Sequence, residues 1–400
     1  MTEPRISPRD ATSETWEAVL VGAGIAGSCL AGALAAQGQR VLLLEKGELP
    51  RSKVCGGCLN SRAVDRLHRF GAGGVLAALE PHPLGRIQFR QANGTLAEFG
   101  LEFDSGYEPV AVSRYQLDEA LAKWAISKGA VYCDRTTVLD TRLEEDSRIV
   151  IARDPERQTL EFRSGAVIAC DGLNSNLARA ARLVNEKAEG FFKLNEKIGC
   201  SIVVPDLSVL NVPLNTIMMA SAEEGYVGVV RIEPGWINIA GALKTSALNE
   251  TKEKPGEMAT RILREVGLTV SDRVAEASWT TCSKLNRSVT SPAAERLLLV
   301  GDAAGYIEPI TGEGMAWALE GAMLAAEQLF HGWTEDTADD YAEGWMDLVG
   351  SRRRTVRAAA FAVDSRLRRQ VALGAMVRVP AIGRHIAKSL NETHHLERMT

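Results

Sequence analysis

The chain has 400 residues, of which 46% are apolar and 24% are charged, and its formal net charge is -5. This composition is typical of a globular protein long enough for more than one domain, and the negative charge argues against a general nucleic-acid binder. No apolar run approaches the roughly 18–20 residues that a membrane-spanning helix needs. Of the modes of membrane association, only peripheral contact is compatible with the sequence.

The first 15 residues, MTEPRISPRDATSET, are polar, contain two prolines and lack the apolar core of a secretory signal. We therefore expect a disordered leader over residues 1–15 and a cytoplasmic protein. The seven cysteines are an odd number in a chain without such a signal, which favours reduced thiols.

Residues 19–46 predict a strand, a glycine turn, a helix and a second strand that ends on an acid. Gly22, Gly24 and Gly27 have the G-x-G-x-x-G spacing, which allows a tight turn, close approach of a pyrophosphate and close helix packing. Glu45 follows Gly22 by 23 residues. A carboxylate at this distance accepts hydrogen bonds from a ribose hydroxyl pair and disfavours a 2′-phosphate. The stretch therefore predicts a dinucleotide site.

A second glycine loop holds Cys55 and Cys58 in a C-x-x-C pattern around Gly56 and Gly57. One such pair, without a second pair or nearby histidines, is a weak zinc signal, and we expect no metal site. Two interpretations stay open. The cysteines form a redox disulfide, or the glycines bring the backbone close to a ligand while the cysteines fill space.

Two further strands are predicted to end in glycine-rich turns. One ends at Asp171-Gly172, and the other at Gly301-Asp302, which is followed by a helix that opens within residues 309–315. Ligands of open α/β sheets bind at the carboxyl ends of strands, and a helix N-terminus preceded by glycines stabilises negative charge. We expect both turns to border the same ligand.

Between these motifs the pattern becomes β-rich. Residues 86–103 alternate around Asn93-Gly94, which predicts a hairpin with a two-residue turn, and residues 198–243 show little helical period. These stretches predict an antiparallel layer that is distinct from the parallel sheet of the dinucleotide unit.

Taken together, GAGIAG with Glu45, DGLNSNLAR and GDAAGYIEPITGEGM resemble the three flavin-binding motifs of the para-hydroxybenzoate-hydroxylase-like flavoproteins, over roughly residues 17–330. Within that group, KVCGG and GEGM resemble the geranylgeranyl-reductase subfamily, whose members reduce isoprenoid double bonds. The resemblance implies bound FAD, with NAD(P)H as a transient reductant. We expect the FAD to be noncovalent, because no histidine or cysteine lies in a recognised attachment motif.

The resemblance also implies an α/β fold with an α+β substrate region. In it, a Rossmann-type FAD-binding domain carries an inserted antiparallel β-sheet substrate domain and a C-terminal helical segment. The expected boundaries are 16–80, 105–195 and 286–335 for the discontinuous FAD-binding domain, 81–104 and 196–285 for the substrate domain, and 336–400 for the helical segment.

By the same resemblance, Glu45 binds the adenosine ribose, Arg114 lies along the FAD chain and Asp302 binds the ribityl hydroxyls. Asp171 belongs to a motif linked to cofactor handling, including that of NAD(P)H, and Pro309 borders the flavin ring. The full predicted set of cofactor-binding residues is Gly22, Gly24, Ile25, Ala26, Gly27, Glu45, Lys46, Lys53, Cys55, Gly56, Gly57, Arg114, Asp171, Gly172, Gly301, Asp302, Pro309, Gly312, Glu313, Gly314 and Met315.

Three functions are compatible with these motifs. The leading hypothesis is an NAD(P)H-dependent monooxygenase that hydroxylates a sizeable apolar or aromatic substrate. The alternatives are a reductase of carbon–carbon double bonds in a lipid-like substrate, with Cys55 as the candidate catalytic residue, and a flavoprotein maturation factor that acts on a protein partner. The sequence predicts a hydrophobic small-molecule substrate and does not indicate an oligomeric state.

The C-terminal segment is basic. Residues 351–390 contain ten arginines and lysines against Asp364 alone, a local charge of about +9. A basic amphipathic helix can lie on an anionic membrane surface, so peripheral membrane contact through this segment is one interpretation. The other is a helix pair packed over the flavin domain with a solvated charged face.

Overall fold

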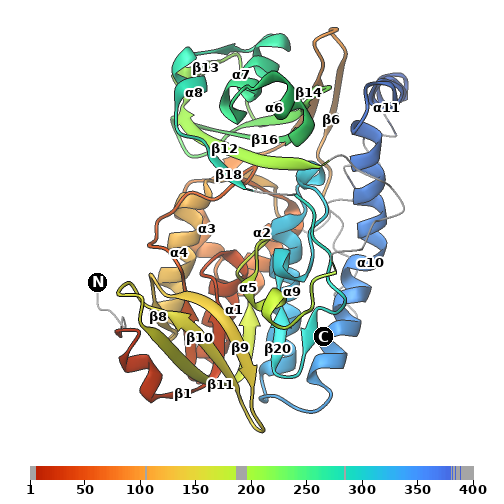
Figure 1. The fold of residues 1–400 in the computed structure, drawn as a ribbon. Helices are drawn as coiled ribbons and strands as arrows, with labels where there is room; N and C mark the ends of the chain where they lie inside the picture. Colours follow the sequence, from red (N-terminus) through yellow and green to blue (C-terminus); the bar gives the residue numbers. More distant parts are fainter. Residues whose placement is uncertain are drawn as a thin grey trace.

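The structure is a computed structural model that describes residues 6–103, 106–185, 196–282 and 285–379, together with 381, 383 and 388. Two sheets lie one above the other in Figure 1, and the C-terminal helices run along one side of both. The helices are α1 (Ile25–Ala36), α2 (Ser61–Arg69), α3 (Gly73–Ala77), α4 (Arg114–Ser127), α5 (Asn176–Ala180), α6 (Thr245–Thr251), α7 (Pro255–Glu265), α8 (Asp272–Glu276), α9 (Gly314–Leu329), α10 (Thr337–Val363) and α11 (Arg366–Arg378), with 3-10 helices η1 (Asp10–Ser13), η2 (Asp206–Ser208), η3 (Gly301–Ala304) and η4 (Pro309–Thr311).

The strands alternate with these helices along the chain. They are β1 (Thr15–Val21), β2 (Val41–Leu44), β3 (Cys58–Leu59), β4 (His82–Pro83), β5 (Arg86–Arg90), β6 (Leu96–Gly100), β7 (Val110–Ala111), β8 (Val131–Cys133), β9 (Thr137–Leu143), β10 (Arg148–Arg153), β11 (Thr159–Ala169), β12 (Lys197–Pro205), β13 (Val209–Leu210), β14 (Thr216–Ala222), β15 (Gly225–Arg231), β16 (Trp236–Lys244), β17 (Thr269–Val270), β18 (Thr280–Cys282), β19 (Ala293–Ala294) and β20 (Leu297–Leu299).

The first sheet has the strand order β19-β20-β11-β1-β2-β8, and β9 and β10 extend it from one side of β11. Neighbours from β20 to β8 along this order are parallel, whereas β10 runs antiparallel to β11 and to β9. The four residues of β2, VLLL, are all buried, as expected for a parallel strand covered on both faces. The α/β fold with a Rossmann-type sheet is therefore confirmed.

The glycine turn after β1 brings α1 close to the sheet. Gly22 has a φ of +104°, and a Cβ built on Gly27 would lie 2.0 Å from the Gly22 carbonyl oxygen. Only a residue without a side chain fits at Gly27. The first turn of α1 is thereby held at the carboxyl edge of β1.

The second sheet has the order β18-β12-β16-β15-β14-β5-β6. It is antiparallel as expected, except that β14 and β5 are parallel. The exception arises because β5 belongs to a separate stretch of chain and is not joined to β14 by a hairpin.

The β5–β6 hairpin is confirmed, but the expectation of a two-residue turn is wrong. Gly94 N donates to Gln91 O at 3.0 Å, and Gln91 N donates to Thr95 O at 3.0 Å. The loop between the bonded residues Gln91 and Thr95 therefore has three residues. Its last residue, Gly94, has the left-handed backbone conformation, with a φ of +83°.

Disorder was expected for residues 1–15, and this expectation is wrong for η1. Ala11 is buried, and Trp16 Nε1 donates to its carbonyl oxygen at 3.0 Å, so the segment is anchored to the start of β1. Arg9 adds an ion pair to Asp154 at 3.0 Å. Residues 1–5 lie outside the described part of the chain.

The helix α10 packs against α9 and the first sheet. Tyr341 Oη donates to Leu299 O at 2.7 Å, and a Cβ on Gly321 would lie 2.6 Å from the Trp345 ring. The next helix, α11, runs beside β6 (Figure 1). Among the described residues, no helix combines the length and the apolar character that crossing a membrane requires.

Replacing Gly27 with alanine tests the close approach of α1 to β1. We expect Gly27→Ala to lower the unfolding free energy of the apoprotein by about 1–3 kcal/mol, because the new methyl group overlaps the Gly22 carbonyl. Gly24→Ala is the matched control, since its Cβ would lie 3.5 Å from Arg114 Nη2, an ordinary contact. Denaturant unfolding checks both, and equal stability of the two variants would contradict the packing argument.

Candidate functional site

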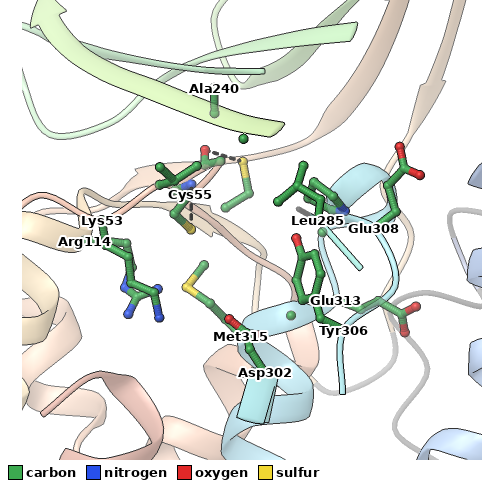
Figure 2. A pocket seen from close by; sticks show the side chains of 18 of the residues that line it. Lys53, Cys55, Arg114, Ala240, Leu285, Asp302, Tyr306, Glu308, Glu313 and Met315 are labelled. Carbon is green, nitrogen blue, oxygen red and sulfur yellow. Dashed lines mark hydrogen bonds between the residues drawn. The ribbon is translucent and has the colours of Figure 1, made fainter. Parts of the chain in front are cut away.

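A cavity of about 280 Å³ lies between the two sheets. Its floor is made by the first turns of α1 and α9 and by the turn after β20. Its roof is the face of the second sheet, from β5, β14, β15 and β16. Figure 2 shows Met315, Asp302 and Arg114 on the floor side and Ala240 on the roof side.

Most of the residues that the sequence analysis singled out meet in the wall of this cavity. They come from five separate stretches of chain, which the turns at the carboxyl edge of the first sheet bring together. Those that line the cavity are Gly24, Ile25, Ala26, Lys53, Cys55, Gly56, Gly57, Arg114, Gly172, Gly301, Asp302, Pro309, Gly312, Glu313, Gly314 and Met315.

Glu45 lies behind the wall. Its Oε2 accepts from Ala23 N at 2.9 Å and its Oε1 accepts from Gly47 N at 3.1 Å. Arg51 Nη2 is also 2.9 Å from Oε2. The carboxylate therefore fixes the glycine turn, and its role toward a ribose stays a prediction.

Lys46, Gly22, Gly27 and Asp171 also lie outside the wall. Lys46 is exposed, and the two glycines shape the turn before α1. Asp171 Oδ2 accepts from Asn176 N at 2.9 Å, so the carboxyl caps α5. Burial raises the pKa of Asp171, although hydrogen bonds at this helix start oppose the shift.

Arg114 begins α4 and is buried. Its Nε and Nη2 donate to the two carboxylate oxygens of Asp118 at 2.7 and 2.9 Å. Burial lowers the pKa of Arg114, but Asp118 and Cys55 outweigh this effect, so the pKa lies above its ordinary value. The guanidinium therefore presents a fixed positive charge at the cavity.

The cavity floor has the features that FAD requires. The N-termini of α1 and α9 both open onto it, and they supply backbone N–H groups and positive dipole ends for phosphates and for a ring that gains negative charge. Asp302 supplies a carboxylate acceptor in the same wall. A Cβ built on Gly56 or Gly312 would meet no atom within 4 Å, so there is room beside both glycines. The residues present therefore fit the cofactor.

The Cys55 loop is tied to the second sheet. Asn238 Nδ2 on β16 donates to Cys55 O at 3.0 Å, and Gly57 N donates to Cys55 Sγ at 3.4 Å. Cys58 Sγ instead donates to Gly56 O at 3.4 Å. Burial and the neighbouring Cys55 raise the pKa of Cys58 to about 12.

All seven cysteines lie in the described ranges, and each is a free thiol. A thiol with a pKa as high as that of Cys58 is a poor partner for disulfide exchange. This geometry favours the interpretation of the C-x-x-C stretch as a loop that approaches a ligand. Across the described residues, no three histidine, cysteine or acidic side chains are grouped so that they could hold a metal ion.

A buried ionic network supports the start of α9. Arg62 Nη2 is 3.1 Å from Glu313 Oε1, and Arg352 Nη1 is 3.3 Å from the same oxygen. Arg62 Nε also lies 3.6 Å from Glu320 Oε1. Burial raises the pKa of Glu313 to about 7, against the opposing effect of Arg62. Sequence reasoning missed Arg62, because nothing in the sequence distinguishes it from Arg66 and Arg69 on the same helix.

Three further residues of the wall were missed. Tyr226 on β15, Tyr306 after η3 and Glu308 before η4 all line the cavity. The ring of Tyr306 points into the cavity in Figure 2. Glu308 lies within the third glycine motif, directly before Pro309, and its position there was the only available signal.

Removal of the Asp302 carboxylate tests whether the cavity floor binds FAD. We expect Asp302→Ala to weaken FAD binding by about 1.5–3 kcal/mol, because it removes charge-assisted hydrogen bonds. Asp302→Asn, which retains an acceptor of the same shape, should lose less. Fluorescence titration of each apoprotein with FAD gives the dissociation constants, and unchanged affinity in the alanine variant would show that Asp302 does not contact the cofactor.

Comparison with known proteins identifies the family. The family model described as "FAD binding domain" matches residues 15–354. Menaquinone reductase from Mycobacterium tuberculosis is 28% identical over 360 residues, which cover 84% of this chain and 80% of that protein. Digeranylgeranylglycerophospholipid reductase from Methanocaldococcus jannaschii is 28% identical over 357 residues, which cover 84% of this chain and 83% of that protein.

A solved structure shows the same fold. OxyS anhydrotetracycline hydroxylase from Streptomyces rimosus superposes with a TM-score of 0.69 at 19% identity, over 94% of this chain and 76% of that one. The family match spans most of the chain and includes every turn of the cavity floor. The protein therefore belongs to the FAD binding domain family and is an FAD-dependent oxidoreductase.

Proposed function

We propose that this enzyme reduces a carbon–carbon double bond in a long apolar, isoprenoid-like substrate. The observation that carries the proposal is the position of the Cys55 loop. Cys55, Gly56 and Gly57 border the same cavity as the flavin-ring motif at Gly312 and the apolar sheet face. The curated relatives named for reduction of menaquinone and of digeranylgeranylglycerophospholipid support the substrate class.

The roof of the cavity suits an apolar molecule. The side chains that face it are mostly aliphatic or thioether groups from the second sheet and from the segment after β18. They include Ile87, Ile217, Met219 and Leu285. Apolar walls with few polar groups bind by removing apolar surface from water, and the few polar groups fix orientation. A concave cavity with apolar walls favours a small molecule over a protein partner.

The residues on the floor have distinct roles in this proposal. The first turn of α1 at Gly24 binds the pyrophosphate, Asp302 binds the ribityl hydroxyls, and the first turn of α9 stabilises negative charge on the reduced ring. Bound FAD supplies hydride transfer, with NAD(P)H as its reductant. The chain excludes water and orients the double bond against the ring.

A monooxygenase that hydroxylates a sizeable apolar or aromatic substrate is the second candidate. The observation that favours it is the apolar lining of the cavity between the two sheets, because oxygen transfer from a flavin also requires the exclusion of water. The product of the reductase gains two hydrogens, whereas the product of the monooxygenase gains one oxygen atom.

Mass spectrometry of the product separates these reactions. We expect the FAD-loaded enzyme with NAD(P)H, under anaerobic conditions, to add two hydrogens to a substrate from a panel of menaquinone, digeranylgeranylglycerophospholipid and squalene. Gain of one oxygen atom, only in air, would replace the reductase with the monooxygenase. In the same assay, product formation should fall more in Cys55→Ala than in Cys58→Ala, because the Cys55 loop borders the flavin-ring motif, while both variants retain FAD. Equal loss in the two variants would indicate a disulfide relay.

We also propose that α11 contacts an anionic membrane surface, from which a lipid-like substrate would enter. Leu367 and Val371, one turn apart on α11, are 72% and 66% exposed. Arg366 and Arg378 are exposed on the same helix. An exposed apolar stripe flanked by arginines is the pattern of an interfacial helix.

Vesicle sedimentation tests this contact. We expect binding to vesicles of phosphatidylserine and phosphatidylcholine, and at least tenfold weaker binding after Leu367→Gln with Val371→Gln, because each side chain contributes about 1.5–3 kcal/mol when buried. Leu207→Gln is the control, since Leu207 is even more exposed, at 83%, but lies on η2. If the control variant binds as poorly as the double variant, α11 is not the contact.

A further inference from the structure

Three ionisable side chains from distant parts of the chain meet in a buried cluster at the edge of the cavity. Lys197 begins β12, Glu308 lies before η4, and Asp364 follows α10. Lys197 Nζ is 2.9 Å from Glu308 Oε1 and 2.9 Å from Asp364 Oδ1. The three side chains are only 3%, 4% and 2% exposed. Glu308 also lines the cavity.

Lys197 faces two carboxylates in a site removed from water, where two close like charges are unfavourable. Arg368 Nη2 lies 3.6 Å from Asp364 Oδ2 and supplies a second positive charge on the Asp364 side, so Glu308 depends on Lys197. Burial raises the pKa of Glu308, Lys197 opposes the shift, and Asp364 adds to it. The net effect favours the protonated form of Glu308.

Tyr226 lies between this cluster and the substrate space. It comes from β15, lines the cavity and lies beside Glu308, but its buried hydroxyl has no well-aligned hydrogen-bond partner. Burial, with the nearby Glu308, raises the pKa of Tyr226 well above its ordinary value. A neutral hydroxyl that lies beside Glu308 at an apolar wall can donate to a bound molecule.

We propose that Glu308 holds the proton that completes the reduction and that Tyr226 passes it to the substrate. This inference rests on the proposed double-bond reduction. As the π bond breaks, a hydride from the reduced cofactor forms one carbon–hydrogen bond. The Tyr226 O–H bond breaks to form the other, and Tyr226 takes the proton of Glu308.

The step leaves an oxidised cofactor, a reduced substrate and a Glu308 carboxylate paired with Lys197. Solvent then returns one proton to Glu308 from the side where Arg368 is partly exposed. Glu308 is thus a proton reservoir fixed between the second sheet and the C-terminal helices. Tyr226 is the catalytic residue that contacts the substrate.

The first test needs neither substrate nor cofactor. Infrared titration of the apoprotein should show a protonated carboxylic acid band that persists well above the pH at which an ordinary glutamate ionises, and Glu308→Gln should remove that band. Glu327→Gln is the control, since Glu327 lies on α9 outside the cavity wall and burial raises its pKa too, so this variant should leave the Glu308 band in place. An ionised Glu308 throughout the titration would overturn the proposal.

The second test uses the anaerobic assay with the same three lipids. We expect Glu308→Gln and Tyr226→Phe each to lower product formation about 100-fold or more, as for loss of a general acid, while FAD content and cofactor reduction by NAD(P)H stay unchanged. Glu327→Gln should retain the wild-type rate. Full product formation in either Glu308→Gln or Tyr226→Phe would overturn the proposal.

The pH dependence gives a further distinction. A proton donor acts in its protonated form, so the wild-type rate should fall as the pH rises through the pKa of Glu308. That pKa is set by Lys197, Asp364, Tyr226 and burial. The rate of Glu308→Gln should not fall over this pH range. If it does fall, the titrating group is not Glu308.

The variants are designed to remain folded. Glutamine keeps the volume of Glu308 and leaves Lys197 opposite Asp364 as a neutral pair. Melting temperature and FAD stoichiometry check this directly. If the wild type reduces none of the three lipids, the proposed function fails, and the infrared titration alone decides whether Glu308 stores a proton.

Discussion

The whole arrangement depends on the close approach of α1 to the first sheet. A side chain at Gly27 would overlap the Gly22 carbonyl oxygen, so the turn leaves the N-terminus of α1 open at the carboxyl edge of β1. The turn after β20 and the first turn of α9 reach the same edge. Two helix dipoles and Asp302 therefore surround one space, and that convergence suits the floor of the cavity to a flavin.

The second sheet supplies the apolar half of the cavity wall. Its apolar face closes the space above the flavin site, and Asn238 ties the Cys55 loop to it. The Lys197–Glu308–Asp364 cluster joins this sheet to the third glycine motif and to the end of α10. The C-terminal helices thus take part in the site, because one of the two acids that Lys197 pairs with belongs to them. Charge on the floor and an acid with a raised pKa at the edge suit one reaction in which hydride and proton arrive from different sides.

The parts predicted from sequence are those governed by local rules. The glycine spacing after β1 and the strand before Asp302 each carry their own signal, and the structure brings these turns together. The missed residues have partners far away in the chain: Glu308 and Lys197 are separated by 111 residues, and Arg62 and Glu313 by 251. No spacing rule reports such pairs. The same reason explains the parallel β5–β14 pair, and burial of Ala11 explains the order of a segment whose composition favoured disorder.

An absorbance titration of the purified apoprotein with FAD tests the central claim, that this cavity is built to hold the flavin noncovalently between the two sheets. The account predicts saturation at one FAD per chain, with the perturbed spectrum of a flavin in an apolar site and full release of free FAD on denaturation. Absence of any spectral change, or flavin that stays attached to the denatured chain, would contradict it.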